Sequence, residues 1–218
     1  MRSIDSMNGN SRISRRFLSG MTLVELVTAI FVMAIAMGGF SILFLRSYKM
    51  NAFILETGVA SAAASRGVDR IVADLRKIRQ GDDGSYPIIS GTGTDLKVYL
   101  DIDNDGKTER VHYFLQNGLL KRGITEPNAT QPVTYPASET VTTIVTYVAN
   151  ETSEPVFFYY NDDYPGDTVN NPLSTPIAVQ DARLVKVRLI ININPNKAPE
   201  ETNVESIAEF RNLNEYVR

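Results

Sequence analysis

Apolar residues are concentrated in one long run near the start of the chain, and no residue from Leu26 to Leu45 carries a charge. As a helix, these 20 residues would rise about 30 Å, which matches the hydrocarbon core of a bilayer. The pattern therefore predicts a transmembrane helix. We place this helix at residues 21–45, which include the five residues before the uncharged run.

The helical pattern continues beyond the apolar run. From Val68 to Ile78 apolar residues recur at three- and four-residue steps, as one face of a helix requires. The first cluster of turn-forming residues is Gly-Asp-Asp-Gly at 81–84. We therefore expect an amphipathic continuation of the same helix over residues 46–80.

Short segments rich in Val, Ile, Tyr and Phe follow, separated by Asn, Asp, Gly and Pro, and this pattern is typical of strands. The dipeptide Asn117-Gly118 predicts a tight hairpin. Near-complete alternation from Leu184 to Ile193 predicts a sheet face that packs on the apolar stripe of the helix. Strands are expected at 95–100, 110–116, 119–122, 140–149, 156–160, 183–193 and 204–212.

These elements predict an α+β fold in which a long N-terminal helix, membrane-spanning in its first half, packs on an antiparallel β-sheet domain at 85–218. The polar, turn-rich segment 159–176 is either a surface connection or a contact with a partner protein. Its Tyr and Asp residues fit both core packing beside a polar loop and a binding patch.

Charge is unevenly distributed along the chain. The formal net charge of the 218 residues is −3, and without the arginine-rich first 20 residues it is −6. An acidic body without a basic stripe argues against direct contact with nucleic acid. Cysteine is absent, which excludes disulfides, thiolate nucleophiles and cysteine-based metal sites.

Motifs of the common enzyme classes are also absent: the sequence has no P-loop, no GxGxxG, no GxSxG and no histidine-based zinc motif. The only histidine, His112, alternates with the apolar Val111 and Tyr113 in an expected strand. Because a catalytic histidine needs a placed partner group, we assign His112 a structural role and expect no enzymatic activity.

Basic residues flank the apolar run on both sides. Arg12, Arg15 and Arg16 precede it, whereas Arg46 and Lys49 follow it. Because positive charge is retained on the cytoplasmic side of a membrane, this bias favours a cytoplasmic N-terminus and an external body. In a secretory signal a small-residue cleavage site follows the apolar stretch, whereas here the small residues Ser19 and Gly20 precede it.

A single carboxylate, Glu25, lies at the start of the apolar segment, where an unpaired charge in hydrocarbon costs about 2.5 to 3.5 kcal/mol on insertion scales. One interpretation is a capping box, in which Thr22 and Glu25 satisfy free N–H groups at a helix start. The other is cleavage after Gly20, which creates an amine at Met21 that the Glu25 of a neighbouring copy can pair with. The two interpretations are compatible.

The stretch GMTLVEL at 20–26, behind a basic leader and ahead of an apolar helix, resembles the class III signal of type IV pilins and type II secretion pseudopilins. The resemblance implies that a prepilin peptidase removes residues 1–20 by cutting between Gly20 and Met21, and methylates the new amine. It also implies that Glu25 guides subunits into a filament. Met21 stands where the family usually has Phe.

Four segments of the body are similar to minor pilins of the W type and to the J-type pseudopilin: 119–122, 155–160, 184–193 and 209–214. The resemblance implies a bacterial inner-membrane protein that crosses the membrane once, contacts membrane lipid, and enters a pilus or pseudopilus at the cell surface. Its partners would be other minor pilins, the major pilin or pseudopilins, and the inner-membrane assembly platform. A minor pilin, a J-type pseudopilin and an uncleaved, signal-anchored periplasmic binding module remain the alternatives.

The segment DIDNDG at 101–106 has the form of a calcium loop, in which alternating carboxylates converge and glycine permits a tight turn. An EF-hand is excluded, because His112 stands at its twelfth position and strands replace its helices. Two interpretations remain. Asp101, Asp103 and Asp105 bind calcium in a hairpin loop, as the resemblance to calcium-binding pseudopilins implies, or they form a solvated turn.

Overall fold

The computed structural model describes residues 20–151, 153–193 and 201–215. Within these residues one helix, α1 (Leu23–Leu75), precedes the strands, and a short 3-10 helix, η1 (Arg211–Glu215), follows them. The strands are β1 (Ile88–Gly91), β2 (Asp95–Leu100), β3 (Glu109–Gln116), β4 (Leu119–Thr125), β5 (Thr140–Val145), β6 (Phe157–Tyr160), β7 (Leu184–Ile191) and β8 (Thr202–Glu209).

The chain divides into two compact units, Met1–Asn51 and Ala52–Arg218, and the boundary falls inside α1. In the first unit the large apolar side chains of α1 are exposed along the whole uncharged run, from Leu26 to Leu45. This stretch is long and apolar enough to cross a membrane, and none of it is buried within the protein. It is compatible with a single-pass membrane anchor near the N-terminus.

In the second unit the last turns of α1 pack into the core through one face. Val68, Ile71, Val72 and Leu75 are all buried, at the three- and four-residue spacing expected from the sequence. Gly67 lies close against β5, because a Cβ at this position would overlap the Cγ2 of Val145. The apolar stripe predicted from the sequence is therefore the buried face of the helix.

The helix ends at Leu75, five residues before the expected end at residue 80. Lys77 N–H donates to the Asp74 carbonyl over 2.9 Å, a tight final turn, and Arg79 N–H donates to the Tyr99 carbonyl of β2 over 3.0 Å. The backbone therefore leaves the helix to bond with the sheet. Ile78 lies beyond the helix but is fully buried.

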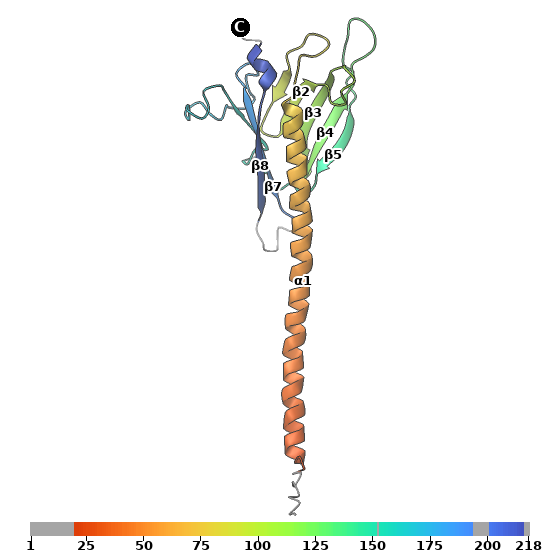
Figure 1. The fold of residues 1–218 in the computed structure, drawn as a ribbon, viewed down its shortest axis with the longest axis vertical. Helices are drawn as coiled ribbons and strands as arrows, with labels where there is room; N and C mark the ends of the chain where they lie inside the picture. The colour runs from red at the N-terminus through yellow and green to blue at the C-terminus, as the bar shows by residue number, and fades with distance from the viewer. Residues whose placement is uncertain (1–19, 152, 194–200, 216–218) are drawn as a thin grey trace, which may run out of the picture. The chain divides into compact units, whose positions relative to one another are not determined.

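The strands form two antiparallel sheets, one of five strands in the order β1-β2-β3-β4-β5 and one of three in the order β6-β7-β8. Val185, Val187 and Leu189 of β7 belong to the same buried cluster as the helix stripe and as Val111 and Tyr113 of β3. Figure 1 shows the strands of both sheets near the end of α1. The expected α+β architecture, a long N-terminal helix packed on antiparallel sheet, is confirmed.

The segment expected as one strand at 140–149 is divided in two. Tyr147 has a positive φ of 61°, which turns the backbone away from β4. Val148 then forms a bridge with Ile191, and Ala149 N–H donates to the Ile190 carbonyl over 2.7 Å. The residues after β5 therefore join the five-stranded sheet to the three-stranded one.

Other strand bounds follow the sequence closely. Strand β2 has its expected bounds, and the Asn117-Gly118 hairpin has positive φ at both positions, 52° and 70°, as a type I′ turn requires. Strand β1 was not expected, because its four residues, IISG, show no clear alternation. The last expected strand, 204–212, spans Thr202–Glu209 instead and gives way to η1.

Candidate functional site

The residues of the GMTLVEL stretch lie at the start of α1. Glu25 N–H donates to Thr22 Oγ1 over 3.3 Å, and Thr22 N–H donates to Glu25 Oε2 over 3.3 Å. Since α1 begins at Leu23, Thr22 is the N-cap residue and Glu25 the third residue of the helix. This is the reciprocal capping box, one of the two interpretations of Glu25 given by the sequence.

The bond between Gly20 and Met21 lies ahead of the first helical residue. Neither residue is in regular secondary structure, and both are exposed, with Met21 at 66%. A Cβ at Gly20 would meet nothing within 4 Å. The peptide bond at this junction is therefore accessible, and the carboxylate of Glu25 lies within the first turn that follows it.

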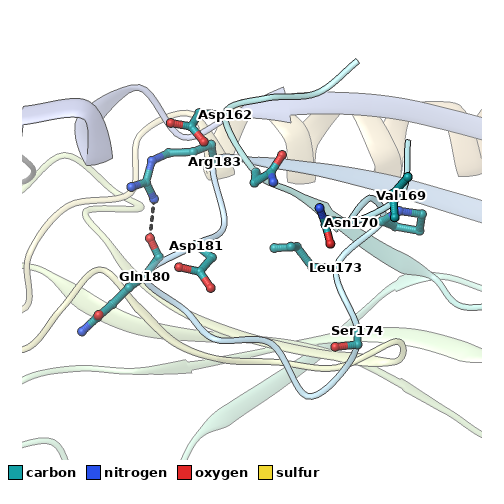
Figure 2. Close-up of a pocket in the computed structure, with 10 residues that line it drawn as sticks. Asp162, Val169, Asn170, Leu173, Ser174, Gln180, Asp181 and Arg183 are labelled. Atoms are coloured by element: carbon teal, nitrogen blue, oxygen red, sulfur yellow. Dashed lines mark hydrogen bonds between the residues drawn. The ribbon is translucent and has the colours of Figure 1, made fainter. Parts of the chain in front are cut away.

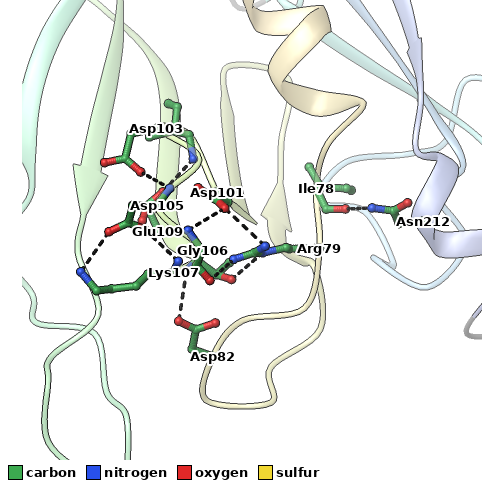
Figure 3. A network of polar contacts seen from close by, with 12 residues as sticks. Ile78, Arg79, Asp82, Asp101, Asp103, Asp105, Gly106, Lys107, Glu109 and Asn212 are labelled. Carbon is green, nitrogen blue, oxygen red and sulfur yellow. Dashed lines mark hydrogen bonds and ion pairs between the residues drawn. The ribbon is translucent and has the colours of Figure 1, made fainter.

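The acidic loop, residues 101–108, connects β2 to β3 (Figure 3). Asp101 Oδ2 accepts from Gly106 N–H over 3.1 Å and pairs with Arg79 Nη1 over 3.4 Å. Asp103 Oδ1 accepts from Asp105 N–H over 3.1 Å. Gly106 has a φ of 93°, a conformation that glycine adopts without strain. The carboxylates of Asp101 and Asp103 therefore hold the loop by accepting from backbone N–H groups within it.

Asp105 belongs to the same loop, but its carboxylate is engaged elsewhere. It accepts from the Lys107 N–H over 2.8 Å and from Lys107 Nζ over 3.0 Å. These bonds, first from the backbone and then from the side chain of Lys107, lower the pKa of Asp105. The group of carboxylates whose oxygens lie close together contains Asp101 and Asp103, without Asp105.

The third member of that group is Glu109, the first residue of β3. Its side chain is fully buried, and Oε2 accepts from the Ile102 N–H over 2.8 Å. Burial raises the pKa of Glu109. Sequence reasoning missed this residue. The signal was present, because the alternation along β3 places Glu109 on the same face as the buried Val111 and Tyr113.

His112 lies in β3 between two carboxylates. Its Nε2 is 2.5 Å from Asp95 Oδ2 in β2, and its Nδ1 is 3.1 Å from Glu139 Oε2. The ring also stacks on Phe114, with centroids 4.4 Å apart. These contacts lie on the face of the sheet opposite Val111 and Tyr113, and they connect β3 to β2 and to the residue before β5. The partner groups that the sequence did not indicate are therefore present, and the structural role of His112 stays a prediction.

A cavity of about 570 Å³ lies beside the segment that follows β6 (Figure 2). Its lining includes the polar side chains Asp162, Asn170, Ser174, Asp181 and Arg183. Arg183 Nη1 donates to the Gln180 carbonyl over 2.6 Å. Among the residues that the structure describes, the charged side chains of the lining are Asp162, Asp181 and Arg183.

The tyrosines next to this cavity pack rather than form a surface patch. Tyr159 is fully buried, and its hydroxyl donates to the Thr92 carbonyl over 3.0 Å. Tyr160 is also buried and packs on Tyr164, with ring centroids 4.3 Å apart. Of the two interpretations of this segment, core packing beside a polar loop describes these side chains.

No protein-family model matches the chain, and no curated protein matches it significantly.

Proposed function

We propose that the chain is a minor pilin, a prepilin that is processed between Gly20 and Met21 and incorporated into a type IV pilus in a tip or initiation complex. The observation that carries the proposal is the GMTLVEL stretch at the start of a long apolar helix. The fold, a long N-terminal helix with an antiparallel β body, is the architecture that the resemblance implies.

Cleavage is supported by the position of the scissile bond. The Gly20–Met21 bond lies before the first residue of α1 and outside regular secondary structure, so its backbone is not held in the helix. Gly20 has no side chain, so a catalytic group can approach the carbonyl closely. Residues 1–19, which form most of the proposed leader, lie outside the described residues.

Assembly would depend on the charge of Glu25. Cleavage leaves a cationic amine at Met21, four residues before this carboxylate. In hydrocarbon each charge alone is costly, and pairing the amine of one subunit with the Glu25 of the next offsets part of both costs. The capping box satisfies Glu25 in the single chain, and exchange of that contact for the amine accompanies entry into the filament.

The proposal places the protein first in the inner membrane, with a cytoplasmic N-terminus and a periplasmic body, and then in the filament at the cell surface. The partners are prepilin peptidase, membrane lipid, the inner-membrane assembly platform, and the other minor pilins and major pilin. A J-type pseudopilin of type II secretion is the second candidate, because the resemblance of the body segments, such as 155–160, includes it equally.

The decisive experiment is intact-mass and N-terminal analysis of the full chain, produced with and without a prepilin peptidase. We expect a peptidase-dependent product that begins at N-methylated Met21 and lacks residues 1–20. Gly20→Ala should block this product, whereas Gly39→Ala, the same change inside α1, should leave it intact.

A chain that begins at Met1 under both conditions would overturn the proposal in favour of an uncleaved, membrane-anchored binding module. If processing occurs, deletion of the gene then separates the two filament systems. Loss of surface pili supports the minor pilin, and loss of protein secretion with normal pili supports the pseudopilin.

A further inference from the structure

We propose that the acidic loop between β2 and β3 binds a calcium ion through Asp101, Asp103 and Glu109. This inference goes beyond the filament function, since it uses only residues of the β body. The sequence pattern suggested Asp105 as the third ligand. In the structure the third carboxylate is that of Glu109, which the pattern did not include.

The three carboxylates converge. One oxygen from each of Asp101, Asp103 and Glu109 lies within 4.8 Å of the others. Calcium binds oxygen at about 2.3 to 2.6 Å, so two ligands on opposite sides of the ion are about 5 Å apart. An ion placed among these oxygens can therefore contact all three without a large rearrangement of the loop (Figure 3).

Two buried oxygens in this group accept no hydrogen bond from the described part of the chain. They are Glu109 Oε1 and Asp101 Oδ1. The Glu109 side chain has no exposed surface, and its other oxygen is occupied by the Ile102 N–H. A carboxylate oxygen that is buried without a donor is costly, and a cation in the cluster would satisfy both oxygens at once.

The charges around the loop favour a divalent ion. Asp101, Asp103 and Glu109 carry three negative charges when ionised, and Arg79 supplies one positive charge through Asp101 Oδ2. The next cation, Lys107, is paired with Asp105. The cluster is therefore left with two negative charges, which one divalent ion neutralises.

The donor set favours calcium over softer metals. All three ligands are carboxylates, and neither nitrogen nor sulfur belongs to the group. Asp103 is exposed, so water can complete the coordination shell from the solvent side. Hard oxygen ligands suit calcium, which accepts variable coordination geometry, whereas magnesium demands stricter octahedral geometry.

The competing occupant is a proton. A neutral Glu109 could donate its hydroxyl to Asp101 Oδ1 and satisfy the same two oxygens. This alternative requires no metal, predicts no response to calcium, and gives Asp103 no role.

The test is calorimetric titration of CaCl₂ into the full chain, purified in detergent and stripped with a chelator, alongside thermal unfolding. We expect one ion per chain with a dissociation constant of about 10⁻⁴ to 10⁻³ M, the range of extracellular calcium modules. About 10 mM CaCl₂ should raise the unfolding temperature, and equal MgCl₂ should raise it less.

Three variants assign the ligands. Glu109→Gln should abolish binding, and Asp103→Asn should weaken it at least tenfold. Asp103→Asn retains the oxygen that accepts from Asp105 N–H, so the loop should still fold and the result remains interpretable if Glu109→Gln does not fold. Asp105→Asn, in the same loop, is the matched control and should bind as the unmodified chain does.

Absence of both heat and thermal shift at about 10 mM CaCl₂ would overturn the proposal in favour of the shared proton. Equal weakening by Asp105→Asn and Asp103→Asn would overturn the ligand set. The Gly20→Ala chain should bind calcium normally, so failure of this site and failure of the filament proposal are distinguishable.

Discussion

Two glycines of α1 have opposite surroundings, and both lie in the second unit of the chain. A Cβ on Gly67 would overlap Val145 Cγ2 and lie 3.2 Å from Ile144 Cγ2. A Cβ on Gly58 would meet nothing within 4 Å. The same methyl group therefore tests packing at one position and helix propensity alone at the other.

Gly67→Ala should destabilise the body by about 1 to 3 kcal/mol, because the buried, β-branched Val145 would have to shift to make room for the Cβ. Gly58→Ala should instead stabilise it by up to about 1 kcal/mol, the propensity difference between the two residues in a helix. Urea unfolding of the full chain, followed by tyrosine fluorescence, measures both. Equal effects of the two substitutions would contradict the close contact between α1 and β5.

The acidic loop illustrates what a residue pattern can reveal. The alternating aspartates at 101, 103 and 105 pointed to the loop that contributes Asp101 and Asp103 to the carboxylate cluster. The sequence did not reveal which of the three carboxylates point toward one another. The Asp105 carboxylate is oriented by its hydrogen bonds to Lys107 and does not belong to the cluster. Glu109 could have been found from strand parity, but only with the start of β3 assigned one residue earlier than the sequence indicated.

At the level of the element, the start of α1 combines a local role and a proposed assembly role in Glu25. Thr22 and Glu25 exchange hydrogen bonds through the capping box. Glu25→Gln retains an oxygen that can accept from the Thr22 N–H but removes the charge. Thr22→Ala removes the hydroxyl from the cap and retains the charge.

If the Glu25 charge directs assembly, Glu25→Gln and Glu25→Ala should both prevent incorporation into filaments while cleavage after Gly20 proceeds. Thr22→Ala should still be incorporated, although loss of the cap costs about 1 kcal/mol of helix stability. Immunoblots of sheared filament and membrane fractions report both steps. Equal loss of incorporation in Thr22→Ala and Glu25→Gln would assign the effect to the cap.

Element bounds were predictable where local pattern decides them. Strand β2 and the Asn117-Gly118 hairpin follow directly from residue type. The end of α1 and the division of 140–149 were not predictable, because distant backbone groups cause them. Arg79 bonds to the Tyr99 carbonyl, and Val148 pairs with Ile191. Tyr99 and Ile191 lie 20 and 43 residues away in the sequence, so the local pattern does not indicate these contacts.

For the whole molecule, the class of fold followed from the order of patterns, one long helix before many short strands. The presence of two sheets did not. Alternation identifies which face of a strand is buried, but strands of either sheet show the same alternation. Val111 of β3 and Val187 of β7 face one shared core from different sheets.

The single apolar helix and the flanking arginines predict the orientation of the protein in the membrane. A phosphatase that is active only outside the cytoplasm, fused after Arg218, should be active in cells. Arg15→Glu combined with Arg16→Glu should lower this activity by weakening the charge bias, whereas Arg211→Glu, in the body, should not. An inactive fusion of the unmodified chain would reverse the proposed orientation.

The order of strands has a consequence for how the body forms. In both sheets every strand pairs with the next strand in the chain, so the pairing of two strands closes only the loop that connects them. Closing a short loop costs less entropy than closing a long one, and chains dominated by local contacts fold faster. Strands β1 to β5 can therefore pair in chain order, before the residues of β6, β7 and β8 are available.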